Sequence, residues 1–383
     1  MSKVKERNVY RRLIVLMVIV MLLCAAACAA YIYLQQTMKT AEQNNLREVT
    51  QINNERVEAY NAEVESLRRD TAGKADAQWP AAAPEGWDVV DLSNYPVAAG
   101  HSEFVTRKEM LSGGLLVINR WHAMPADLTD DMMVSIGNYS RADENANNNV
   151  ATEDSSVMLQ QEATEALMSL YEGGRAAGLE MKYLIVQYGY RTMETQTNYW
   201  NKKIAALESR YSGDQLIEHA RKDVSYPGTS DYQSGLSVYF YNYKSGDKEF
   251  NSTLLHNTEH GKWLFENSWK YGYVFRFPVQ NFPYPNTVDK SYKTGISMEM
   301  KVYRYVGIAN AAAMHTLDLC LEEYVEYLMQ HPHIAVYENG ELKYEIYRVS
   351  GGYADTTVQI PKGADSYSVS SDNIGGLVVS IAY

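Results

Sequence analysis

The segment "SYPGTSDYQSGLSVYFYN", residues 225–242, joins a tight turn to a strand. Its Pro-Gly pair is typical of a turn, after which Ser230 suits a turn or cap position. The run "GLSVYFYNY" (235–243) has the aromatic and β-branched composition of a strand. Tyr232 and Tyr239 are seven residues apart, so a regular strand would turn them to opposite faces, and a bend would be needed to bring them together.

Strand and helix patterns alternate on both sides of this segment. Further strands are predicted at 113–121, 182–190, 272–277 and 299–307. Helices are predicted at 155–179, 193–211, 260–272 and 310–329. Helices and strands mixed in this way, without regular βαβ units, predict an α+β domain with a largely antiparallel sheet.

The chain then changes to a pure strand pattern. "IAVYENGELKYEIYRV", residues 334–349, contains two alternating runs around Asn339-Gly340, which is a strong signal for a β-hairpin. We therefore predict that the α+β domain occupies residues 91–330 and that residues 331–383 form a small β extension.

The N-terminal part of the sequence predicts export and anchoring. Residues 13–34 are uncharged and long enough to cross a membrane as a helix. The basic flank at 1–12 places the N-terminus in the cytoplasm and the bulk of the chain outside, in a single-pass arrangement. Small residues at 25–30 leave a cleaved signal peptide as the alternative to an uncleaved anchor. Residues 35–72 are predicted to be a charged helical stalk, and the Ala/Pro/Gly-rich residues 73–90 a linker.

The charge of the chain restricts the classes of binding partner, and its cysteine content restricts the disulfide bonds that it can form. The formal net charge is −12, and the first twelve residues carry five basic and one acidic side chain, so the remainder carries about −16. This balance argues against nucleic acid as a partner. Two of the three cysteines lie in the membrane segment, so Cys320 has no partner for an internal disulfide and the exported part must depend on its core.

Four ordered blocks resemble one known family. They are "YGYRTMETQ" (188–196), "PGTSDYQSGLSVY" (227–239), "KWLFENSWKYGYVFRFP" (262–278) and "EMKVYRYVG" (299–307). Together they resemble the zinc D-alanyl-D-alanine carboxypeptidases of the vancomycin-resistance type, which trim peptidoglycan stem peptides. The resemblance implies an antiparallel-sheet zinc-carboxypeptidase fold, a bacterial cell envelope, and a peptidoglycan stem peptide as partner.

The resemblance also implies where a zinc site would lie and what has replaced it. The family's second block reads S-x-H-x-x-G-x-A-x-D, with His and Asp as zinc ligands, and its last block reads E-P-W-H-Y-R-Y-V-G, with Glu as general base and His as third ligand. Glu299 matches the general base. The three ligand positions hold Tyr232, Tyr239 and Val302.

The substrate side of the family's site is retained. By the resemblance, Arg191 and Gln196 bind the substrate peptide and its terminal carboxylate, and Ser230 is a third matching position. Two alternatives remain open: Arg191 could be a structural ion-pair partner, and Glu299 could simply accept hydrogen bonds within the old site.

Loss of all three ligands has a direct chemical consequence. A catalytic zinc needs about three protein ligands and a water whose pKa it lowers to roughly 7. Valine has no lone pair, and a neutral tyrosine is a poor substitute for imidazole. We therefore expect no bound zinc, no cofactor and no hydrolysis of the family type, which leaves Glu299 as a retained but inactive position.

Three functions remain open at this stage. The leading hypothesis is a membrane-anchored, zinc-less pseudoenzyme that binds stem peptides. The second is an active D,D-carboxypeptidase with an atypical metal site. His256 and His260, four apart on a helix predicted at 252–263, have the spacing of a metal half-site, but the intervening glutamate of such motifs is missing and a solvated face is favoured. The third is a cell-envelope scaffold that recruits proteins through the stalk or the β extension.

Overall fold

The computed structural model describes residues 13–37, 39–40, 84–142, 149–296 and 299–383, and the chain divides into two compact units, Met1–Ala77 and Gln78–Tyr383. In the first unit, Leu13–Thr37 is a helix long enough and apolar enough to cross a membrane. A helix therefore coincides with the predicted anchor at 13–34. The predicted basic tail and most of the predicted stalk and linker lie outside the described residues.

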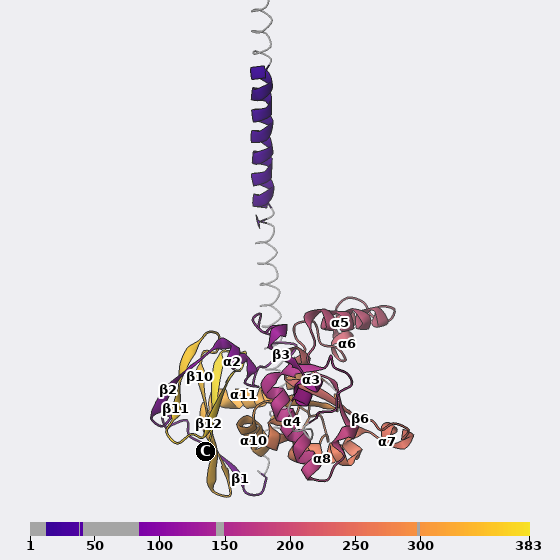
Figure 1. The fold of residues 1–383 in the computed structure, drawn as a ribbon, viewed down its shortest axis with the longest axis vertical. Coiled ribbons are helices and arrows are strands. Elements are labelled where there is room, and N and C mark those ends of the chain that lie inside the picture. The colour runs from indigo at the N-terminus through magenta and orange to yellow at the C-terminus, as the bar shows by residue number, and fades with distance from the viewer. Residues whose placement is uncertain (1–12, 38, 41–83, 143–148, 297–298) are drawn as a thin grey trace, which may run out of the picture. The chain divides into compact units, whose positions relative to one another are not determined.

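The second unit contains a four-stranded antiparallel sheet, called the central sheet below, whose strand β6 is labelled in Figure 1. Its strands, in spatial order, are β5 (Leu184–Tyr188), β6 (Ser237–Asn242), β8 (Val302–Tyr305) and β7 (Tyr273–Phe275). Each of them lies within a predicted strand, and the mixture of helices with an antiparallel sheet confirms the α+β class.

The two faces of this sheet have different neighbours. Val238 and Phe240 on β6 and Tyr303 on β8 pack into one buried core with α4 (Gln161–Ala176). Because side chains alternate along a strand, Tyr239 and Val302 point to the opposite face. These two residues are cross-strand partners in the register of β6 and β8, so their side chains are neighbours there.

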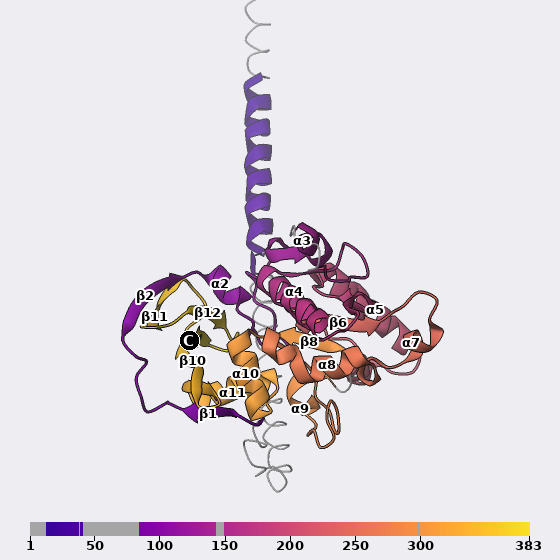
Figure 2. The ribbon, with the colours of Figure 1, turned by 60° about the horizontal axis from the view of Figure 1, so that its bottom comes forward.

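Two helices, α10 (Ile308–Leu317) and α11 (Leu321–Gln330), lie between the central sheet and a second sheet (Figures 1 and 2). The prediction of a single helix over 310–329 was wrong, because Asp318 has a left-handed backbone conformation with φ 53° and ends α10. The helical spacing of apolar residues continues past Asp318, so the sequence pattern alone could not reveal that the helix ends there.

The second sheet is built from both ends of the unit. Its strands, in spatial order, are β1 (Trp87–Asp91), β9 (His333–Glu338), β10 (Glu341–Ser350), β13 (Gly376–Ala382) and β12 (Ser366–Ser371). The predicted hairpin is confirmed, since Asn339 and Gly340 both have positive φ between β9 and β10. Residues 87–90 were predicted as the end of the linker but are part of β1, which pairs with β9.

Shorter elements complete the unit. They are β2 (Gly100–Val105), paired with β11 (Thr356–Pro361), β3 (Met133–Ser135), paired with β4 (Met158–Gln160), and the helices α2 (Arg107–Ser112), α3 (Ile136–Ala142), α5 (Met193–Leu207), α6 (Gly213–Arg221), α7 (Lys248–Ser252), α8 (Glu259–Asn267) and α9 (Ser291–Thr294).

Residues 113–121 do not form the predicted strand. The segment is buried and extended, but its backbone groups find irregular partners: Leu115 N donates to Ser370 Oγ at 2.9 Å, and Val117 N donates to the carbonyl of Asp372 at 3.1 Å. The Arg304 guanidinium donates to the carbonyl of Leu116 at 3.0 Å. The segment's apolar composition reflects its burial, whereas strand pairing needs a neighbouring edge that it lacks.

The predicted helix over 252–263 was also wrong. A 3₁₀ turn at Leu255–Asn257 is separated from α8 by Thr258, whose side chain caps α8. His256 and His260 therefore do not share a helix face. His260 is buried and its Nε2 lies 3.1 Å from the carbonyl of Glu180, while His256 packs edge-on against Phe282.

Candidate functional site

A tight turn sets the geometry of the site. The 3₁₀ turn Asp231–Ser234 follows Ser230, its N-cap residue, and ends at Gly235, which has φ 69°. A Cβ at Gly235 would meet the Met133 side chain, and the positive φ is a conformation that favours glycine. Ser230 is buried in the cap position that the sequence had offered as its alternative role. Its part in substrate binding stays a prediction.

The turn brings together the three positions that the resemblance matches to zinc ligands. Tyr232 from the turn and Val302 from β8 are buried in one small apolar cluster with Phe277, and Tyr239 from β6 packs against it. The bend needed between Tyr232 and Tyr239 is supplied by the turn ending at Gly235. The backbone thus keeps the three positions close to one another.

The side chains at these positions do not fit a zinc ion. Burial raises the pKa of the Tyr232 phenol well above its ordinary value, and its hydroxyl is buried without a hydrogen-bond partner among the described residues. Burial also raises the pKa of Tyr239, and Val302 has no donor atom. In the described ranges, no group of three or more His, Cys, Asp or Glu side chains could hold a metal ion. Neutral phenols and an alkyl group cannot supply a zinc ligand set of the usual kind.

Arg191 lies against these aromatic rings. Its Cζ atom is 3.9 Å from the ring centroid of Tyr232, 4.7 Å from that of Tyr199 and 5.4 Å from that of Tyr188. Such stacking positions the guanidinium without neutralising its charge. Arg191 forms no ion pair with any residue that the structure describes. The alternative role as a structural ion-pair partner therefore finds no carboxylate within the described ranges.

Gln196 forms a hydrogen bond with the guanidinium of Arg191. Its side chain is completely buried, and its Nε2 donates to the carbonyl of Ser225 at 2.7 Å. The amide oxygen accepts a long hydrogen bond of 3.4 Å from Arg191 Nη1. The structure thus brings together Arg191 and Gln196, which were predicted as substrate-binding residues, and gives Gln196 the position of a support. Tyr188 and Tyr199 were missed as site residues, because nothing distinguishes them among 31 tyrosines.

Glu299, the predicted general-base position, lies just before β8 and is half-buried. Burial raises its pKa above the ordinary value, against the opposing effect of Arg191 and Lys301. No described residue gives it a hydrogen bond or an ion pair, and its role, as a retained base position or as an acceptor of internal hydrogen bonds, stays a prediction. Lys301, whose Nζ lies 5.6 Å from the Tyr239 ring centroid, is likewise without an ion-pair partner in this set.

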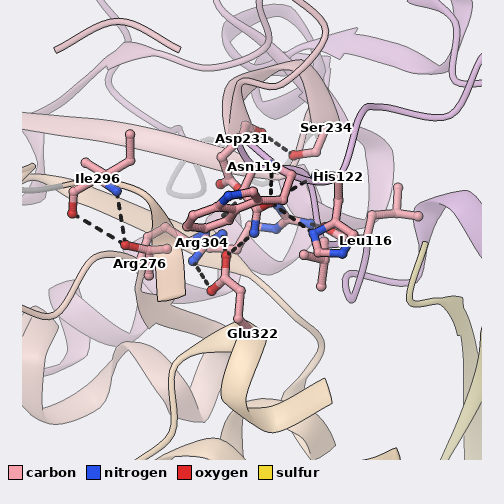
Figure 3. A network of polar contacts seen from close by, with 12 residues as sticks. Leu116, Asn119, His122, Asp231, Ser234, Arg276, Ile296, Arg304 and Glu322 are labelled. Atoms are coloured by element: carbon pink, nitrogen blue, oxygen red, sulfur yellow. Dashed lines mark hydrogen bonds and ion pairs between the residues drawn. The ribbon is translucent and has the colours of Figure 1, made fainter. Parts of the chain in front are cut away.

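A buried ion network that sequence reasoning missed lies beside the site (Figure 3). Asp231 Oδ1 accepts from Arg276 Nε at 3.1 Å and from Arg304 Nη1 at 2.7 Å, and Ser237 donates to its other oxygen. Arg276 in turn forms a bidentate pair with Glu322, at 2.7 and 2.9 Å. The arginines in the otherwise apolar runs "VFRF" and "VYRYVG" were the available signal.

The network is electrically balanced, with two guanidinium groups facing two carboxylates. Burial alone would raise the pKa of Asp231, but Arg276 and Arg304 hold it below its ordinary value. The pKa of Glu322 is also held below its ordinary value, by Arg276 and by the amide of Asn119, which donates to Glu322 at 3.0 Å. All four charged side chains are 6% exposed or less, so their charges are compensated internally.

Comparisons with known proteins agree with this architecture. Residues 156–308 match the VanY family model, described as D-alanyl-D-alanine carboxypeptidase. A D-alanyl-D-alanine carboxypeptidase of Enterococcus faecium is 29% identical over 280 residues, which cover 72% of this chain and 78% of the relative. One from Enterococcus faecalis is 36% identical over 162 residues, covering 42% of this chain and 52% of that relative. The match thus spans about half of the second relative's length.

A solved structure supports the fold. The vancomycin-resistance D,D-dipeptidase VanXYg, determined in complex with a D-Ala-D-Ala phosphinate analog, superimposes with a TM-score of 0.55 at 22% sequence identity. The superposition covers 74% of this chain and 99% of that one. This likeness concerns the fold and adds nothing about the chemistry of the site.

Proposed function

Because residues 156–308 belong to the D-alanyl-D-alanine carboxypeptidase family, we propose that this protein is a zinc-less pseudoenzyme that binds peptidoglycan stem peptides at its former active site. The peptide is bound through its C-terminal carboxylate and is released unchanged. The domain keeps the binding half of the family's site and has lost the half that performs hydrolysis.

The observation that carries the proposal is the guanidinium of Arg191. It is held by three tyrosine rings and by Gln196, yet has no ion pair with a described residue. A guanidinium presents several N–H donors in a plane and forms charge-assisted hydrogen bonds with a carboxylate. A peptide with a free C-terminal carboxylate supplies that missing partner.

The absence of hydrolysis follows from the donor set. Amide hydrolysis of the family type needs a metal-activated water and a base to deprotonate it. Tyr232, Tyr239 and Val302 offer no zinc ligand set, so a water near Glu299 keeps the pKa of ordinary water. Glu299 alone cannot generate an effective nucleophile from it at neutral pH.

We place this domain outside the cytoplasmic membrane. The support is the apolar helix Leu13–Thr37 with the basic residues of 1–12 before it, which favours a signal-anchor with the N-terminus in the cytoplasm. A tether of this kind keeps the binding domain close to newly made cell wall, where stem peptides still carry their terminal D-alanine.

The test is a titration of the full chain in detergent with an N-acylated stem peptide ending in D-Ala-D-Ala, followed by calorimetry. The same peptide with a C-terminal carboxamide should bind at least 10-fold more weakly, because Arg191 loses its anion. Arg191→Ala should weaken binding of the carboxylate form by about 10- to 100-fold, the range for a lost charge-assisted hydrogen bond. Lys202→Ala, which removes an exposed cation from α5, is the matched control and should bind as the wild type does.

Turnover and metal content are measured on the same preparation. We expect no release of D-alanine and no stoichiometric zinc after incubation with the metal. Chelator-sensitive release of D-alanine would replace the proposal by an active carboxypeptidase with an atypical metal site. Equal affinity for the carboxylate and carboxamide peptides, unchanged in Arg191→Ala, would leave the scaffold role.

A further inference from the structure

Two histidines between α11 and β9 contact the end of β1 and the residues that follow it. His331 Nδ1 lies 2.8 Å from Asp91 Oδ2, and His333 Nδ1 lies 3.0 Å from the carbonyl oxygen of Tyr95. The backbone adds a third contact, because Leu92 N donates to the carbonyl of His333 at 2.8 Å. We call the contacts of His331 and His333 with residues 91–95 the histidine clasp.

The clasp holds one end of an edge strand. β1 lies at the edge of the second sheet and pairs with β9. Its first residue is held by packing, since Trp87 contacts Trp269 edge-on with 5.1 Å between ring centroids. Its last residue, Asp91, is held by the clasp. Among the described residues, β1 is the first strand after the helix Leu13–Thr37, so a pull from the N-terminal side of the chain reaches the second sheet through β1.

The surroundings of His333 favour a protonated imidazole. Both ring nitrogens face oxygen atoms that accept hydrogen bonds, because Nδ1 faces the carbonyl of Tyr95 and Nε2 lies 2.8 Å from Glu345 Oε1. The other oxygen of Glu345 accepts from the Tyr383 hydroxyl at 2.6 Å, as suits an ionised carboxylate. A neutral imidazole has one N–H donor and one lone pair, so it satisfies only one of the two acceptors around His333, whereas an imidazolium satisfies both.

The pH dependence of this buried pair follows from its two pKa values. The hydrogen bond with Glu345 raises the pKa of His333, against the effect of burial, and the same hydrogen bond lowers the pKa of Glu345. The stability that His333 contributes is therefore complete below its unfolded value of 6.5 and is lost as pH rises through the folded pKa. The contribution of Glu345 is present above 4.5 and is lost as pH falls. The guanidinium of Arg348, also on β10, pairs with Asp372 and leaves Glu345 to the histidine.

The exposed half of the clasp keeps its negative charge over the same pH range. Hydrogen bonds from Ser93, with a smaller contribution from His331, lower the pKa of Asp91 to about 2. His331 also stacks on the ring of Tyr327 of α11, with 4.4 Å between ring centroids. The contact of His331 with Asp91 is an ion pair only when the imidazole is protonated. Both histidines thus hold residues 91–95 more strongly as cations.

We propose that the histidine clasp is a pH-sensitive fastening of β1: the protonated histidines hold residues 91–95 against the second sheet, and their deprotonation loosens this end of the strand. Once loosened, β1 opens from β9 more often. Each opening lengthens the connection towards the N-terminal helix and uncovers the edge of β9. The device is independent of what binds at the former active site.

The experiment measures hydrogen exchange of the full chain in detergent by mass spectrometry, at about pH 6 and about pH 8, on either side of the ordinary histidine range. Rates are corrected for the intrinsic pH dependence of amide exchange. Protection of the peptides that cover residues 87–95 should be about 5- to 10-fold lower at the higher pH, the size expected for weakened charge-assisted hydrogen bonds. β12, the other edge strand of the same sheet, is the internal reference and should keep its protection.

Variants assign the effect to the clasp. The double variant His331→Gln and His333→Gln should show, at both pH values, the low protection that the wild type shows at the higher one. His101→Gln is the matched control, because it removes an exposed histidine that lies 3.1 Å from Glu103 on β2, and it should keep the wild-type pH dependence. Asp91→Asn disrupts only the exposed half of the clasp and leaves the buried pair in place, so it should reduce the pH effect even if the double variant does not fold.

Three results would overturn the inference. The first is equal protection of residues 87–95 at the two pH values in the wild type. The second is a pH effect of the wild-type size in the folded double variant or in Asp91→Asn. The third is an equal loss of protection in β12, which would show that the sheet as a whole responds to pH. None of these results bears on peptide binding at Arg191, so the proposed function stands or falls separately.

Discussion

Two neighbouring regions on one face of the central sheet differ in whether their charged side chains form ion pairs with described residues. In the ion network, Asp231 and Arg304 are buried and every charge has a partner. Tyr232 follows Asp231 in the chain and Val302 lies two residues before Arg304, and both belong to an apolar cluster. Arg191, which stacks on Tyr232, has no ion pair with a described residue. The difference indicates which charges the fold needs. Buried charges without partners would cost several kcal/mol, so the network is structural, whereas a charge at a half-buried position can be solvated and need not be paired for the chain to fold.

The largest expected effect comes from building a metal site in the apolar region. In the triple variant Tyr232→His, Tyr239→Asp and Val302→His, we expect one zinc ion per chain with micromolar or tighter affinity, equivalent to about 8 kcal/mol. The reason is geometric: Tyr239 and Val302 are cross-strand partners, and Tyr232 packs into the same cluster. Metal analysis after dialysis, together with calorimetric zinc titration, measures this.

Each double variant serves as the control, because two ligands hold zinc far less tightly than three. Double variants should show no stoichiometric zinc after dialysis. A triple variant that keeps the wild-type circular dichroism spectrum but takes up no zinc would contradict the claim that the backbone still holds these positions in ligand geometry.

The ion network should respond most strongly in stability. Glu322→Gln removes one carboxylate and leaves the buried Arg276 guanidinium undercompensated, for an expected loss of about 3–5 kcal/mol in the free energy of unfolding. Urea denaturation of the full chain in detergent measures the loss. Glu299→Gln is the contrast and should stay within about 0.5 kcal/mol of the wild type, since that carboxylate has no partner to lose. Equal losses in the two variants would remove the distinction between the two regions.

Local sequence patterns predicted the structural features that depend on a few adjacent residues. Alternation and composition located the four central strands, and Asn339-Gly340 located the hairpin, because a turn type depends on a few adjacent residues. The positions matched to zinc ligands came from the family resemblance, and that role stays a prediction, whereas the structure shows that the turn ending at Gly235 brings them close together.

Long-range pairing could not be predicted in the same way. Asp231 meets Arg276 across 45 residues, and no local pattern encodes such a partnership. Residues 113–121 have the composition of a strand, but whether a strand forms depends on a free sheet edge elsewhere in the chain. The aromatic environment of Arg191 likewise depends on α5 bringing Tyr199 to the end of β5.

Two buried tyrosines provide a finer comparison. The Tyr232 hydroxyl has no hydrogen-bond partner among the described residues, whereas the Tyr273 hydroxyl donates to the carbonyl of Ala163 at 2.5 Å. Tyr232→Phe should therefore be neutral or stabilising by up to about 1 kcal/mol, and Tyr273→Phe should destabilise by about 1 kcal/mol. Thermal and urea unfolding of both variants measure this difference. Destabilisation of similar size in both would mean that the Tyr232 hydroxyl has a partner after all.

The smallest effect concerns the pH dependence of stability, where the two regions should have opposite signs. Glu299 has a raised pKa in the folded state, so its contribution is most favourable below its unfolded value of 4.5 and is lost as pH rises through the folded pKa. Glu322 has a lowered pKa, so its contribution is present above 4.5 and is lost as pH falls.

Unfolding free energies between pH 3.5 and 7 should reveal these signs as differences from the wild type. The deficit of Glu322→Gln should shrink as pH falls, because the wild-type carboxylate becomes protonated and then resembles the amide. Glu299→Gln should be slightly favourable near pH 7 and should lose that advantage towards pH 4. A Glu299→Gln deficit that grows with pH would mean that the ionised carboxylate is stabilised by a partner in the folded protein, and Glu299 would then belong with the structural charges of the ion network.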